Sequence, residues 1–164
     1  MPFPQDAQMY RTALINQVPS TIAGGDMTLL QLTLPARIFR DIGDTVVVLG
    51  NAVLAANANS KTTTLKLAVP AGDTVIAGRT ATDNAGTRFM QAWIYRISAT
   101  AIQTAGLCTT LATATSIVTD NATLTVDFTL PLILKLNAQA ATTDGDVTSR
   151  LLKFYYIPVN SNFQ

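Results

Sequence analysis

Apolar and polar residues alternate with a period of two along most of this chain. The clearest example is segment 130–138, in which Leu130, Leu132, Leu134 and Leu136 occupy every second position. Segments 27–34 and 62–69 show the same alternation. Successive side chains of a strand point to opposite faces, so this pattern predicts strands that turn one face toward a core.

Turn-forming Gly, Pro, Asn and Asp residues separate these segments. Taken as boundaries, they predict strands at 27–34, 45–55, 62–69, 74–77, 88–98, 106–118, 123–128, 130–138 and 150–157. Such regular spacing is typical of a β-sandwich or a small barrel, and eight strands in two sheets is the number found in a jelly roll. We therefore expect an all-β fold, a two-sheet jelly-roll β-sandwich of about eight strands.

Both ends of the chain differ from this pattern. Segment 7–15 is bracketed by prolines and either forms one short helix or lies extended. We expect an N-terminal arm at residues 1–25, a jelly-roll β-sandwich domain at 26–158 and a C-terminal tail at 159–164. Proline lowers the entropy that an extended segment loses on docking, so the apolar side chains of both ends are predicted contacts to a neighbouring chain. These are Phe3, Met9, Tyr10, Leu14, Ile15 and Phe163.

The composition supports strands and describes an unusually uncharged surface. The chain has 25 Thr, 11 Val and 11 Ile but no Glu, a bias toward β-branched residues and away from a good helix former. Only 13% of the residues are charged, and the mean hydropathy is +0.29. An uncharged strand surface in water invites aggregation. We therefore expect other chains to cover much of it, in a homotrimer or another cyclic oligomer.

The same composition argues against most enzymes. Without His the chain has no Ser-His-Asp or Cys-His pair, and its single Cys can form neither an internal disulfide nor a zinc site. We expect no enzymatic activity, no cofactor, no metal and no small-molecule substrate. Eleven scattered Lys and Arg residues and a net charge of +1 argue against nucleic acid as a partner.

Membrane insertion and export are not expected either. The longest apolar stretch, 46–56, is interrupted by Gly50 and Asn51 and is far shorter than the roughly 20 residues of a spanning helix. The first residues lack the basic start and apolar run of a signal peptide.

Two Asp-rich segments and one Asn-rich segment have alternative interpretations. Segments 41–44 and 144–146 carry carboxylates that suit a hard cation, but neither has a full ligand set, so we interpret both as plain turns. Asn57, Asn59 and Lys61 could contact a partner chain or a sugar. A hairpin turn with one solubilising lysine is the interpretation we favour.

Aromatic and arginine side chains are the remaining candidates for binding. Trp93, Tyr95, Tyr155 and Tyr156 could form a platform for sugar stacking, but the alternation favours core packing for them. Arginine is enriched at interfaces because its fork pairs with carboxylates. For four arginines in or near predicted loops, an interface role and a solvated charge remain open: Arg37, Arg40, Arg79 and Arg88.

Several turn and strand signatures resemble bacteriophage virion proteins with a jelly-roll domain. They are the Gly43-Asp44-Thr45 turn before a strand with a central Gly50, the Asn-x-Asn-x-Lys turn within 56–62, the aromatic strand 93–96 that ends in Arg, and the Thr/Asp-rich turn before a final Tyr strand in 143–156. The likeness covers roughly residues 40–157. The family includes capsid decoration (cement) proteins and parts of tail fibres.

This resemblance implies a structural virion protein. It would be made in the cytoplasm of the bacterial host, lie on the outer capsid surface and bind between subunits of the major capsid protein. Arg37 and Arg40 join the apolar residues of the two ends as expected interface residues. The alternative is a tail-fibre module that binds a receptor or a carbohydrate.

Overall fold

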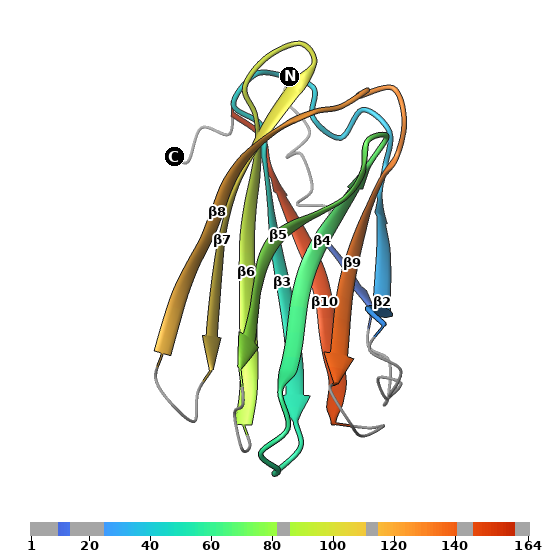
Figure 1. Cartoon of the computed structure of the whole chain (residues 1–164). Coiled ribbons are helices and arrows are strands. Elements are labelled where there is room, and N and C mark those ends of the chain that lie inside the picture. Colours follow the sequence, from blue (N-terminus) through green and yellow to red (C-terminus); the bar gives the residue numbers. More distant parts are fainter. Residues whose placement is uncertain (1–9, 14–24, 82–85, 111–114, 141–145, 160–164) are drawn as a thin grey trace, which may run out of the picture.

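Two antiparallel β-sheets pack face to face in the computed structural model (Figure 1). The structure describes residues 10–13, 25–81, 86–110, 115–140 and 146–159. Within these residues there is no helix long and apolar enough to cross a membrane. The strands are β1 (Tyr10–Ala13), β2 (Met27–Leu34), β3 (Thr45–Leu54), β4 (Lys61–Val69), β5 (Gly72–Ala81), β6 (Gly86–Arg96), β7 (Ala101–Thr110), β8 (Thr115–Thr125), β9 (Leu132–Ala140) and β10 (Val147–Ile157).

The strand order is that of a jelly roll widened by one hairpin. One sheet has the order β1-β10-β3-β6-β7-β8, and the other has the order β2-β9-β4-β5. Without β7 and β8, eight strands remain as two four-stranded sheets, β1-β10-β3-β6 and β2-β9-β4-β5, which is the jelly-roll arrangement. The expected all-β, two-sheet jelly roll is confirmed.

The core lies between the sheets and follows the predicted alternation. In β3 every second residue is buried, from Val46 to Leu54, and the residues between them are half-buried on the opposite face. In β9, Leu132, Leu134 and Leu136 point inward in the same way. Each sheet thus contributes one apolar face, and burying these two faces together is the main force that stabilises the fold.

The predicted strand at 106–118 is wrong, because two strands share this region. β7 ends at Thr110 and β8 begins at Thr115, and the two pair as an antiparallel hairpin. Residues 111–114, Leu-Ala-Thr-Ala, include no Gly, Pro, Asn or Asp and therefore carry no turn signal. The turn predicted at 119–121 is instead a register shift inside β8, opposite the step from Thr104 to Gly106.

Two further boundaries differ from the sequence prediction. β5 is longer than the predicted segment 74–77, and it pairs with β4 from Gly72 to Ala81 with one register shift. Residues 10–13, within the segment predicted as an arm, form β1 along the edge of β10, so the extended alternative is correct for this piece. The predicted contacts Phe3, Met9, Leu14, Ile15 and Phe163 lie outside the described residues.

Candidate functional site

The outer face of the six-stranded sheet carries a nearly uncharged, largely apolar surface. Strand register places side chains of four neighbouring strands, β10, β3, β6 and β7, in rows across it. Directly opposed residues have Cβ atoms roughly 5 Å apart, so each row is continuous. The three central rows are Tyr155-Val47-Trp93-Ala105, Lys153-Leu49-Gln91-Leu107 and Leu151-Asn51-Phe89-Thr109.

Three of the four candidate aromatic residues belong to this outer face. Trp93, Tyr95 and Tyr155 are half-buried at outward positions, so the interpretation as core residues is wrong for them. Three inward positions of β6 are taken by smaller apolar residues, Met90, Ala92 and Ile94, and the fourth is taken by Arg88. Only Tyr156 among the four packs against the core.

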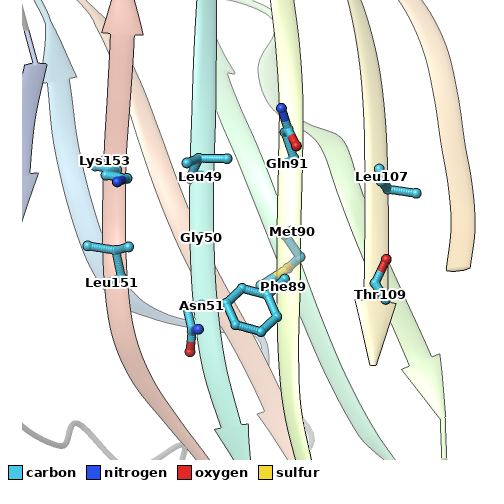
Figure 2. Close-up of a pocket in the computed structure, with 10 residues that line it drawn as sticks. All are labelled: Leu49, Gly50, Asn51, Phe89, Met90, Gln91, Leu107, Thr109, Leu151 and Lys153. Carbon is cyan, nitrogen blue, oxygen red and sulfur yellow. The ribbon is translucent and has the colours of Figure 1, made fainter. Parts of the chain in front are cut away.

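A hollow of about 300 Å³ lies in the middle of this outer face (Figure 2). Leu49, Leu107 and Leu151 supply apolar walls, and Phe89, which is 45% exposed, lies over the space between β6 and β3. Lys153 is the charged residue of the hollow, and its Nζ lies 4.9 Å from the centre of the Tyr155 ring. Such a surface suits an apolar partner with few charges, because a docked charge would lose water without finding a partner.

The loops before β3 and β9 and the end of β10 lie at one end of the sandwich, uppermost in Figure 1. They carry exposed apolar and basic side chains. Ile42 is 62% exposed in the loop before β3. Leu130, in the loop before β9, and Val159, just after β10, are about half exposed. Arg37 and Arg40 are also exposed in the loop before β3. Both predicted interface arginines are therefore accessible, and exposed apolar side chains lie at the same end of the sandwich.

Arg37 has a left-handed backbone, with φ of 60°. Among the described residues, Arg37 is the only non-glycine residue with a positive φ. Its N–H donates to the carbonyl of Phe128 at 2.7 Å. This conformation is costly for an L-residue with a long side chain, and such strain concentrates at functional sites. The strain marks the loop before β3 as a candidate contact region.

Asp44 holds that loop in place through hydrogen bonds to both of its carboxylate oxygens. Its carboxylate accepts hydrogen bonds from the N–H groups of Arg40, Asp41 and Val159 and from the Tyr156 hydroxyl. Burial alone would raise the pKa of Asp44, but these hydrogen bonds together outweigh it, so the pKa lies below its ordinary value. The interpretation of segment 41–44 as a turn agrees with this arrangement.

Arg96 supports the same loop from the adjacent strand. Its guanidinium donates to the carbonyls of Phe39, Arg40 and Ser98 and lies 4.4 Å from the centre of the Phe128 ring. An arginine with these backbone and ring contacts fixes three loops relative to one another. The loop end is thus a prearranged surface, which reduces the entropy lost on binding.

The opposite end of the sandwich contains a polar cluster that the sequence did not reveal. Lys61 is fully buried, so the interpretation as a solubilising lysine is wrong. Its Nζ donates to the backbone carbonyls of Asn57 and Asn59 and to Oδ1 of Asn57. Asp146, also buried, accepts from the side-chain amides of both asparagines. The alternation of β4 could have indicated that Lys61 lies on its inward face.

Arg88 is likewise buried, so neither an interface nor a solvated loop position describes it. It belongs to β6, and its Nη1 crosses to the other sheet to bind the carbonyls of Lys61 and Arg79 and the hydroxyl of Thr63. Arg79 is half-buried in β5. The described residues contain no group of three Cys or Asp side chains placed to hold a metal ion.

No family model matches this chain. No curated protein sequence matches it either.

Several solved structures show a weak similarity to the chain. The VP2 subviral particle of infectious bursal disease virus is 13% identical with a TM-score of 0.40, over 95% of this chain and 34% of that one. The VP2 chain of the T13 particle of the same virus gives 14% and 0.41, over 93% and 32%. This chain thus spans about a third of those capsid chains.

A protein of unknown function from Shewanella oneidensis MR-1, SO2946, is 12% identical with a TM-score of 0.41, over 94% of this chain and 78% of that one. At these identities and TM-scores no function is transferred to this chain.

Proposed function

We propose that this chain is a non-enzymatic structural protein of a bacteriophage virion that decorates the capsid. It binds as an oligomer between subunits of the major capsid protein, on the outer surface of the particle. The observation that carries the proposal is the composition of the outer face of the six-stranded sheet. In its three central rows of side chains, Lys153 is the one charged residue. The sequence resemblance over residues 40–157 supports a phage virion as the particle to which this protein belongs.

The physical argument is that this surface is costly to leave in water and needs little rearrangement to bind. Leu49, Leu107 and Trp93 stand on paired strands, whose backbone is already fixed by the sheet. Each buried apolar side chain contributes on the order of 1–3 kcal/mol on docking, and little of this gain is lost to ordering. A passive protein that cements neighbouring subunits requires no more chemistry than this.

A homotrimer is the form in which we expect the protein to act. Closed symmetry lets copies cover one another's uncharged strands without leaving a free edge, and repeated weak contacts add up around the cluster. Because β8 lies at the edge of the six-stranded sheet, it is available to a neighbouring copy. Light scattering of the purified protein measures this directly, and a clean monomer at micromolar concentration contradicts it.

The test of decoration compares two lysine substitutions on opposite sheets. Leu107→Lys places a charge on the proposed docking face, opposite Gln91. Thr33→Lys places the same charge at an exposed position of β2 on the other sheet. We expect Leu107→Lys to lower the number of copies bound per particle at least tenfold and Thr33→Lys to leave it unchanged. Equal occupancy for both variants would refute docking through this face.

A carbohydrate-binding module of a tail fibre is the second candidate. The outward position of Trp93, Tyr95 and Tyr155 favours it, because exposed aromatic rings stack on sugar rings. The two candidates differ in what covers Trp93, the only tryptophan of the chain. Its fluorescence therefore reports on this one position.

Tryptophan fluorescence distinguishes the two candidates. If decoration is correct, empty capsids shift the Trp93 emission to shorter wavelength and protect it from acrylamide, whereas host surface glycans do neither. The opposite result supports the sugar-binding module. Trp93→Phe supplies the blank that corrects for fluorescence of the partner.

A further inference from the structure

Lys61, Asn57 and Asp146 form a connected group at the end of the sandwich opposite the exposed arginines, in which Asn57 is half-buried and the other two residues are buried. Lys61 begins β4, Asn57 lies in the loop before it, and Asp146 directly precedes β10. Lys61 is 0% exposed and Asp146 is 2% exposed. Enclosing an amine, an amide and a carboxylate together, away from water, is costly unless they satisfy one another.

The contacts within this group place an amine against a side-chain amide. Lys61 Nζ lies 2.8 Å from Oδ1 of Asn57. The same Oδ1 accepts the backbone N–H of Asn59 at 3.1 Å. On the other side of the amide, Asn57 Nδ2 donates to Oδ1 of Asp146 at 2.6 Å. The Asn57 amide therefore lies between the lysine and the aspartate.

These contacts correspond to the groups that acyl transfer requires. In such a reaction Lys61 Nζ, which lies 2.8 Å from Oδ1 of Asn57, would be the nucleophile, and the Cγ bonded to that oxygen would be the carbon attacked. The N–H of Asn59 is a fixed donor to the oxygen on which negative charge develops. Asp146 touches the nitrogen that must leave, where a carboxyl group can relay protons. Holding all these groups in place supplies the proximity that such reactions need.

We propose that Lys61 and Asn57 form an intramolecular amide (isopeptide) bond. The bond from Nζ of Lys61 to Cγ of Asn57 forms, and the bond from Cγ to Nδ2 breaks. The Lys61 ammonium gives up two protons, Asp146 relays them, and the leaving nitrogen departs with them as ammonium. No oxidant or other reactant is required, and a buried charge is replaced by a neutral amide.

A second lysine of the chain provides an internal comparison. Lys66 pairs with Asp26, and Asp26 Oδ2 also accepts Nδ2 of Asn137 at 2.7 Å. There the lysine contacts the carboxylate, and the carboxylate contacts the asparagine, so the amine faces no amide carbonyl. We expect Lys66 and Asn137 to remain unlinked. The comparison separates the geometry needed for reaction from the mere presence of the three residue types.

The test is the mass of the intact, folded wild-type protein. The proposal predicts a mass lower than the sequence mass by one ammonia. Trypsin should then release a peptide spanning residues 41–66 that is uncut at Lys61, and fragmentation should show the two side chains joined. A wild-type protein of full sequence mass, with Lys61 cleaved by trypsin, overturns the proposal, and this outcome does not depend on any variant folding.

A cyclic imide at Asn57 would also release ammonia, and Lys61→Met distinguishes it from the proposed bond. Lys61→Met removes the nucleophile and should restore the full mass, whereas an imide would persist in it. Asp146→Asn keeps the shape of the site and should leave Lys61 and Asn57 intact and unlinked. Lys66→Met is the matched control and should retain the loss of ammonia. Persistence of that loss in Lys61→Met overturns the proposal.

Discussion

The Tyr156 hydroxyl donates a 2.7 Å hydrogen bond to Oδ2 of Asp44, joining residues 112 positions apart in the chain. Tyr156 lies near the end of β10, and Asp44 directly precedes β3, the neighbouring strand of the same sheet. Val159 adds a backbone N–H to the other carboxylate oxygen. A single buried carboxylate therefore fixes both the loop before β3 and the chain after β10.

Asp44→Asn should destabilise the protein by about 2 kcal/mol, since hydrogen bonds to a charged group contribute about 1.5–3 kcal/mol and the amide offers only one acceptor oxygen. Tyr156→Phe is the matched control, because it removes one of the four donors and should cost about 1 kcal/mol. Urea denaturation measures both values. An Asp44→Asn protein as stable as the wild type would mean that the loop is held by Arg96 and its own packing.

The lowered pKa of Asp44 also predicts how stability depends on pH. A carboxyl whose pKa is lower in the folded than in the unfolded state stabilises the fold above its unfolded pKa of about 4. This contribution is lost as the pH falls from there through the folded pKa. Denaturation curves between about pH 2 and 5 should therefore show a steeper loss of stability for the wild type than for Asp44→Asn.

The sequence predicted the fold better than it predicted the surface. Alternation and turn residues suffice for β2, β3, β4, β6, β9 and β10, because each has one face in the core and has Gly, Pro, Asn or Asp close to at least one of its ends. Residues 111–114 include none of these, so the sequence does not predict where β7 ends and β8 begins. Asn or Asp between two apolar runs is compatible with either a turn or a bulge. The sequence therefore predicts a turn at 119–121, where the structure has a register shift within β8.

The candidate sites were harder to predict, because alternation fixes the two faces of a strand but not which face is the core. In β6, Trp93 and Tyr95 alternate with Ala92 and Ile94, and the bulkier set is the outward one. Buried lysine is rare, so the sequence predicts an exposed Lys61, whereas the structure buries it. Its partners Asn57 and Asp146 are far apart in sequence, and only the folded arrangement brings them together.

Arg88 should be among the most sensitive positions of the chain. It joins the two sheets through carbonyls of β4 and β5, so Arg88→Met removes these charge-assisted hydrogen bonds from the core and should cost more than about 3 kcal/mol. Arg88→Lys keeps the charge but lacks the fork, and it should recover only part of this loss. Thermal unfolding ranks the stability of Arg88→Met, Arg88→Lys and the wild type. Equal stability of Arg88→Lys and the wild type would show that charge alone is sufficient.

Two core glycines should differ in their response to alanine. A Cβ at Gly78 would lie 2.9 Å from the carbonyl oxygen of Thr63, which is backbone and cannot move aside. A Cβ at Gly50 would lie 2.7 Å from Cδ2 of Leu65, the end of a flexible side chain. We expect Gly50→Ala to cost about 1 kcal/mol and Gly78→Ala about 3 kcal/mol, the two ends of the range for overpacking. Midpoints of denaturant-induced unfolding compare the stability of the two variants. A larger loss of stability in Gly50→Ala than in Gly78→Ala would contradict the argument.

Arg37→Gly separates stability from binding at the loop end. Glycine adopts the left-handed backbone of Arg37 without steric cost, and the hydrogen bond from this position to Phe128 uses only the backbone N–H. Relief of about 1–2 kcal/mol of strain is offset by the greater entropy of glycine in the unfolded chain, so stability should stay within about 1 kcal/mol of wild type.

If Arg37 contacts the capsid, Arg37→Gly should nevertheless lower capsid occupancy several-fold. Arg150→Gln is the matched control, because it removes the same charge at an exposed position of the β10 bulge. Its occupancy should be unchanged. Nearly unchanged stability together with a loss of binding means that the strained backbone is retained for the contact that the side chain makes. Full occupancy of Arg37→Gly would instead assign the strain to the connection between the loop and Phe128.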